Sequence, residues 1–155
     1  MAWSVVNFGK YRGKGKTLPQ IVFNDPDWFF WALNEGTFKG ALADEARDVA
    51  KKAVKIKIPG SPVGEKRVRY YIDPNVHKLA NVEVISSTQP PHVGSSATRE
   101  SDYFDLSMAR RIAHYDKTGG QFIVRAIKFH VFGSASARLT KSRCEEFFET
   151  RSNFD

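Results

Sequence analysis

The sequence is poor in cysteine and has no long apolar run. Among its 155 residues Cys144 is the single cysteine, so no intrachain disulfide can form and nothing indicates an oxidising compartment. No apolar run approaches the roughly 20 residues that a membrane-spanning helix needs. Residues 1–9 lack a basic segment followed by a long apolar one, so they do not predict a signal peptide. These absences predict a cytoplasmic protein without a membrane partner.

Motifs of catalysis and metal binding are also scarce. The histidines are scattered without metal-ligand spacing, one cysteine cannot complete a usual zinc site, and no nucleophile elbow occurs. Asp73 and Glu83 have a separation seen in restriction-type nucleases, but Ile85 stands where such a site needs lysine. The sequence therefore predicts no cofactor and no bound metal, and it favours a protein without a catalytic centre. A small metal-dependent nuclease remains an alternative.

Aromatic side chains and positive charge are abundant. Hydrophobic residues make up 41% of the chain and aromatic residues 13%, which is enough to form a core. A chain of this length suits one domain, residues 1–155. The net charge of +7, with a pI near 9.6, favours a polyanionic partner such as DNA or RNA.

Helical spacing and capping residues predict several helices. Asp25 is a candidate N-cap, Pro26 suits the first helical position, and Gly36 suits the end of the same helix. Thr140 is a candidate cap for the last helix, in which Cys144 is expected to be a buried structural thiol. The predicted helices cover residues 17–23, 26–35, 38–54, 105–115 and 140–149.

Alternation of apolar and polar residues predicts strands and an α+β fold. The strongest pattern covers residues 121–132, and residues 86–98 are expected to form a long loop. The other predicted strands cover residues 3–8, 54–58, 67–72 and 79–85. We expect a mainly antiparallel sheet of about four to five strands packed with four to five helices.

Positive charge is concentrated between residues 51 and 78, which carry eight basic and two acidic residues. A period of two puts Lys55 and Lys57 on one face of the first strand here, and Arg67, Arg69 and Tyr71 on one face of the next. If the two strands pair in a hairpin or meander, these residues form a basic face with an aromatic ring for stacking. The alternative is a polar outer face that only keeps the protein soluble.

A second basic element is the glycine-rich turn from Gly9 to Thr17. It ends in Gly-Lys-Thr, but five residues separate Gly9 from Gly15, whereas a phosphate loop requires four. The turn therefore does not predict a nucleotide-binding loop. Its glycines and cations instead suit contact with phosphate groups, the alternative being a hairpin with solvated lysines.

The N-terminal segment resembles a known family. Phe-Gly-Lys-Tyr-Arg-Gly-Lys at residues 8–14, Thr-Leu at 17–18, Asp-Pro-Asp-Trp at 25–28 and Trp-Ala-Leu at 31–33 look like the small C-terminal module of exodeoxyribonuclease X-like proteins. The resemblance covers about residues 7–36, and the sequence departs from it by the extra Gly-Lys step at 15–16. The module accompanies a nuclease domain that has no counterpart here, and it is taken to contact DNA.

The resemblance implies a division of roles within this segment. Residues 1–40 would form a module-like hairpin with helices, and residues 41–150 the α+β remainder. Phe8, Trp28 and Trp31 would belong to the core. The residues implied as phosphate contacts are Lys10, Tyr11, Arg12, Lys14 and Lys16.

Taken together, these patterns predict a non-catalytic, sequence-tolerant nucleic-acid-binding protein of a bacterial or phage accessory type. DNA is favoured over RNA as the partner. An adaptor or structural protein of a phage or plasmid, docking an acidic partner, is the main alternative. The sequence leaves open whether the chain forms a homo-oligomer.

Overall fold

Helices occupy both ends of the chain and strands occupy the middle. The structure, a computed structural model, describes residues 3–112 and 117–155. The helices within this range are α1 (Leu18–Asn24), α2 (Pro26–Asn34), α3 (Ala41–Ala53), α4 (Met108–Ile112), α5 (Lys117–Val131) and α6 (Lys141–Glu149). The strands are β1 (Ile56–Lys57), β2 (Lys66–Ile72), β3 (Leu79–Ser86), β4 (Ala97–Ser101) and β5 (Tyr103–Phe104). The α+β prediction is confirmed.

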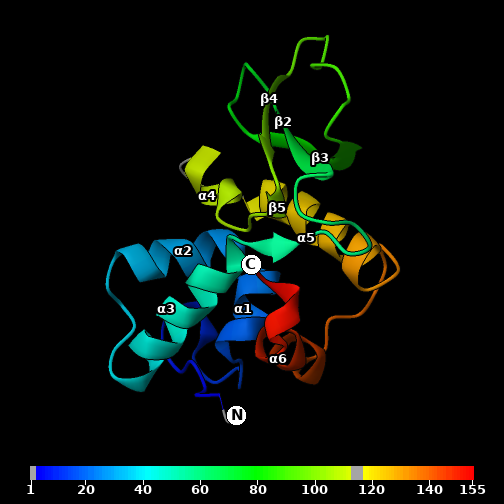
Figure 1. Cartoon of the computed structure of the whole chain (residues 1–155). Helices are drawn as coiled ribbons and strands as arrows, with labels where there is room; N and C mark the ends of the chain where they lie inside the picture. Colours follow the sequence, from blue (N-terminus) through cyan, green and yellow to red (C-terminus); the bar gives the residue numbers. More distant parts are fainter. Residues whose placement is uncertain (1–2, 113–116) are drawn as a thin grey trace.

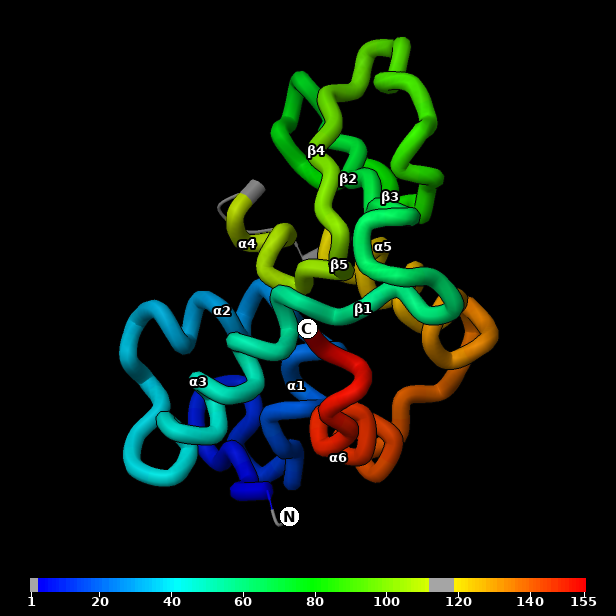
Figure 2. The backbone as a smooth tube through the Cα atoms, viewed as in Figure 1, coloured from blue at the N-terminus to red at the C-terminus, as the bar shows by residue number. Residues whose placement is uncertain are grey.

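Figure 1 shows a helical body made of α1, α2, α3 and α6, with the three-stranded sheet of β2, β3 and β4 on the far side of α5. Figure 2 shows that the connection between β3 and β4 reaches the end of the molecule opposite the N-terminus. The sheet is therefore an appendage of the helical core, and α5 joins the two parts through its contacts with β3 and with α1 and α2.

The N-terminal helices form where the sequence predicts them. Asp25 caps α2, because its side chain accepts a hydrogen bond from the Trp28 amide and Pro26 occupies the first turn. Gly36 follows the helix with φ +69°, a left-handed conformation that favours glycine. Short 3₁₀ turns at Gly9–Tyr11 and Arg151–Asn153 flank the regular elements.

An aromatic cluster joins α1 to the C-terminal helices. The Phe23 ring meets Phe147 and Phe148 of α6 at centroid distances of 5.4 Å, and Phe132 at 6.2 Å. Edge-to-face and tilted rings at these distances contribute beyond the area that they bury. α1 packs against α2, α3, α5 and α6, so it is the central helix of the body.

The strands form two sheets rather than one. β2 lies between β3 and β4, whereas β1 pairs with β5, all antiparallel. The expected pairing of residues 54–58 with 67–72 is therefore wrong. Ile56 of β1 is fully buried and has Phe104 on one side and Phe154 on the other, so both of its edges are taken.

The prediction of a strand at residues 121–132 is wrong. Most of this segment belongs to the helix α5. Ile123, Val124 and Ile127 are buried at helical spacing, while Phe129 is 57% exposed. A Cβ on Gly120 would stand 2.9 Å from Pro26 Cγ, so the start of α5 packs closely on α2. Packing against β3 and α2 favours the helix despite a composition rich in β-branched and aromatic residues.

Other boundaries differ in smaller ways. Residues 3–8 form a single bridge, from Val5 to Thr17, in place of the predicted strand. β4 arises partly within the predicted loop 86–98. Residues 113–115 of the predicted fourth helix lie outside the described residues. In the last helix Thr140 accepts from the Arg143 amide as predicted. Within the described ranges, no helix has the length and apolar character that crossing a membrane requires.

Candidate nucleic-acid interface

The predicted strand face is closed by ion pairs and by a loop. Arg69 is only 2% exposed, and its Nε donates to Glu100 Oε2 at 3.0 Å. Its Nη2 donates at 3.0 Å to the carbonyl oxygen of Pro90, in the connection between β3 and β4. A guanidinium enclosed in this way holds the loop onto the sheet, and its hydrogen bonds are directed inward.

Arg67 and Tyr71, on the same face, also have protein partners. Arg67 lies 3.6 Å from Glu100 and 3.7 Å from Asp102, although its side chain is half-exposed. The Tyr71 hydroxyl donates to Glu83 at 2.5 Å, and its ring meets His92 edge-on at 4.9 Å. Burial and the Glu83 hydrogen bond raise the pKa of Tyr71. Both the hydroxyl and the ring of Tyr71 therefore have partners within the protein.

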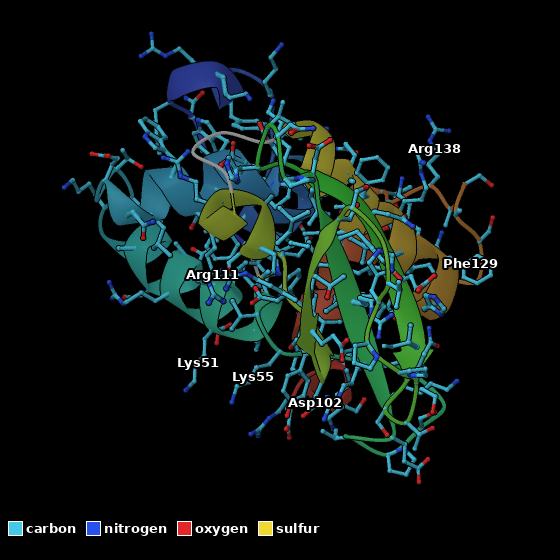
Figure 3. The ribbon with its side chains drawn as sticks, turned by 90° about the horizontal axis from the view of Figure 1, so that it is seen from above. Lys51, Lys55, Asp102, Arg111, Phe129 and Arg138 are labelled. Atoms are coloured by element: carbon cyan, nitrogen blue, oxygen red, sulfur yellow. The ribbon has the colours of Figure 1, made fainter. Side chains whose placement is uncertain are left out.

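Lys55 and Lys57 lie in or next to the other sheet, in which Lys57 pairs with Tyr103. They flank Ile56 in and before β1, next to the C-terminus, where the Asp155 amide donates to the Lys55 carbonyl. Figure 3 shows Lys51 and Lys55 pointing outward along one edge of the molecule, whereas Arg138 and Phe129 lie at the opposite edge. The structure therefore does not unite the predicted strand residues in one basic face.

Two residues of the N-terminal turn serve its folding. Tyr11 is 5% exposed, and its ring packs edge-on against Trp28 at 4.8 Å, so it cannot stack on a base. Burial raises the pKa of its hydroxyl. Lys10 forms an ion pair with the fully buried Asp25, the cap of α2. Both contacts fix the turn on the start of α2.

Four consecutive backbone amides of the turn, those of residues 11–14, have partners within or beside it. Gly9, Gly13 and Gly15 have φ between +59° and +70°, which bends the chain sharply. The Gly13 amide donates to Asn7 Oδ1 at 2.8 Å, and the amides of residues 11, 12 and 14 donate to carbonyls of the turn. These four amides are therefore not free for a phosphate, whereas the side chains of Arg12 and Lys14 are exposed.

A cavity of about 150 Å³ opens where the turn meets α1, α5 and the segment before α6. Its polar lining comes from Tyr11, Lys16, Gln20, Asn24, Gln121 and Lys128. Ile21, Phe23, Val124, Leu139 and Cys144 form its apolar wall. Two lysines from opposite ends of the chain thus share one small cavity.

The electrostatics of the cavity wall agree with this geometry. Burial, then the nearby Glu145 carboxylate, raises the pKa of the Cys144 thiol to about 12. Lys128 and Lys16 both oppose this rise, which means that both ammonium groups lie close enough to the sulfur to stabilise a negative charge there. The surroundings of the sulfur therefore include two ammonium groups as well as the Glu145 carboxylate.

This region carries a signal that the prediction from sequence missed. Residues 3–24 contain four basic residues and residues 121–144 contain five, and neither segment contains an acidic one. The two segments meet: Gln121 Nε2 donates to the Asn24 carbonyl at 3.1 Å. A search for stretches without acidic residues would have found them.

Six cations of these two segments are here called the turn–α5 surface: Arg12, Lys14, Lys16, Lys128, Arg138 and Lys141. Lys16 and Lys128 line the cavity, and Arg138 and Lys141 flank the lining residue Leu139 in sequence. Among the described residues none of the six has an ion-pair partner. This distinguishes them from the arginines of the strand face.

The residues considered for a nuclease centre have local structural roles. Asp73 Oδ1 accepts from the amides of Asn75 and Val76 and so closes a turn, while Glu83 accepts from Tyr71. Across residues 3–112 and 117–155, no group of three or more His, Cys, Asp or Glu side chains is placed to hold a metal ion. Comparisons with protein-family models, with curated proteins and with solved structures found no match.

Proposed function

We propose that this chain binds nucleic acid without sequence preference, through the turn–α5 surface. The observation that supports this most is the meeting of two segments that have several cations and no acidic residue, around a cavity lined by Lys16 and Lys128. Side chains with no acidic partner can neutralise phosphates and release the counterions condensed on them. The arginines of the strand face are already neutralised by carboxylates and offer less.

Phe129 provides the aromatic contact in this proposal, in place of Tyr11 and Tyr71. It lies on α5 one residue after Lys128 and four after Arg125, and it is 57% exposed. An exposed ring beside cations suits stacking on an unpaired base, which tolerates any sequence because every base has a π-face. The helix therefore offers charge and stacking on adjoining stripes.

Salt titration of oligonucleotide binding tests the proposal. Each phosphate contact contributes roughly 0.9 to the slope of log affinity against log salt for a duplex, and roughly 0.7 for a single strand. Replacing Lys16 and Lys128 together by glutamine should lower a duplex slope by about 1.8. Arg67→Gln is the matched control and should leave the slope unchanged.

Polyglutamate serves as a competitor that separates nucleic acid from other polyanions. We expect it to displace oligonucleotides only at much higher charge concentration, since it lacks bases for Phe129. Equal competition would favour an adaptor that docks an acidic protein. No oligonucleotide binding at low salt would exclude the proposed function.

A further inference from the structure

One polar side chain at the cavity has no role in the proposed contact with a phosphodiester backbone. Gln20 lines it, and its buried Oε1 has no hydrogen-bond partner among the described residues. A buried amide oxygen without a partner destabilises the folded state. A half-turn of the carboxamide would put Nε2 in the same place as a donor, because the two ends of the group have nearly the same shape. The Gln20 side chain therefore has hydrogen-bonding capacity that the described residues do not use.

The size of the cavity limits which chemical group can bind in it. About 150 Å³ is half of the roughly 300 Å³ at which pockets for drug-sized molecules begin, so a nucleobase with its sugar does not fit. An internal phosphodiester is attached on two sides, so it would bring two nucleotides to a cavity of this size. A terminal phosphate is attached on one side only, so it can enter while the rest of the strand stays outside.

Charge favours the same group. A phosphate monoester carries between about −1.5 and −2 at neutral pH, whereas a diester carries a single negative charge. The ammonium groups of Lys16 and Lys128 supply two positive charges, and the Gln20 amide can add a hydrogen bond to a third oxygen. Asn24 and Gln121 add further amide groups to the polar wall.

We infer that this cavity is a binding site for a phosphate monoester, namely the terminal phosphate of a nucleic-acid strand. The inference rests on the proposed function, since it treats the turn–α5 surface as the path along which the strand approaches. The protein then binds the end of a nucleic-acid strand more tightly than an internal position of that strand.

The test compares oligonucleotides of one sequence that carry a phosphate at the 5′ end, at the 3′ end, or at neither. Dissociation constants are measured by fluorescence anisotropy at fixed salt, with the dye at the opposite end. We expect one phosphorylated end to bind about 10-fold more tightly than the hydroxyl form, or about 1.4 kcal/mol. Gln20→Leu should bring this ratio close to one, and circular dichroism checks that the variant is folded.

The outcomes separate the inference from the function on which it rests. Equal affinity for all three oligonucleotides would overturn the terminal-phosphate site and leave nucleic-acid binding intact. Inorganic phosphate that binds as tightly as the phosphorylated strand would assign the cavity to free phosphate and overturn the strand end as its source. An absence of binding by every oligonucleotide at low salt would overturn both.

Discussion

Lys10 and Lys14 are equivalent in the sequence of the turn, but the structure gives them different roles. Lys10 forms an ion pair with Asp25, which is fully buried and caps α2, while its own side chain stays 40% exposed. Lys14 is exposed and has no ion-pair partner among the described residues. Lys10→Ala would leave a buried carboxylate without its counterion, whereas Lys14→Ala would only remove a solvated charge.

The size of the effect follows from these exposures. Breaking a buried ion pair by removing one partner costs about 3–5 kcal/mol. Water already reaches Lys10 and would partly solvate the Asp25 carboxylate once the lysine side chain is removed, so we expect a loss of roughly 2–3 kcal/mol. For a chain of this length, that lowers the melting temperature by roughly 5–10 °C. Lys14→Ala should change the stability by less than about 0.5 kcal/mol.

Urea and thermal unfolding of a double-mutant cycle provide the assay. Lys10→Ala combined with Asp25→Asn should recover part of the loss. Asparagine also caps a helix, and it carries no charge that would be left buried without a partner. Lys14→Ala, in turn, should weaken oligonucleotide binding. If Lys10→Ala melted within about 1 °C of Lys14→Ala, the ion pair would not stabilise the turn and the division of roles would be refuted.

Three further predictions concern buried groups. Tyr70→Phe removes a hydroxyl that accepts from the Asp105 amide at 2.8 Å and donates to the Tyr103 carbonyl at 3.2 Å, so it should cost about 1–3 kcal/mol in urea unfolding. Burial raises the pKa of Asp105 above its ordinary value of 3.8, so the native state holds the proton more tightly than the unfolded chain. The stability contributed by the Asp105 proton is fully present below pH 3.8 and is lost as the pH rises through the raised pKa. The Asp105→Asn variant should not show this loss of stability. Cys144, whose thiol pKa burial raises to about 12, should resist Ellman's reagent at pH 8 until the chain is unfolded, and rapid native-state labelling would contradict its burial.

Features set by neighbouring residues could be predicted from the sequence. Asp25 and Thr140 cap their helices as expected, because a cap needs only a side-chain oxygen within three residues of the amide that it accepts from. The burial of Cys144 followed from its spacing to Phe148 on the same helix. Such signals are local, so tertiary contacts did not overturn them.

Features that depend on distant partners could not be predicted. The buried state of Arg69 is caused by Glu100 and the Pro90 carbonyl, which lie in or beside the segment predicted as a loop. For α5, Ile123, Val124 and Ile127 fit a helical spacing, but the β-branched and aromatic composition favoured a strand. That error also hid Lys128 of α5, and Arg138 and Lys141, which follow α5, were likewise absent from the predicted site.

A charge-reversal comparison tests the proposed location of binding most directly. One variant carries Lys14→Glu, Lys16→Glu and Lys128→Glu of the turn–α5 surface, and the other Lys51→Glu, Lys55→Glu and Lys57→Glu in and around α3 and β1. Both lower the net charge equally, so they differ only in where the charge is lost. At 100 mM salt we expect the first to weaken oligonucleotide binding by about 100-fold and the second by about threefold or less. Equal losses, or a larger loss for the second variant, would contradict the turn–α5 surface as the binding site.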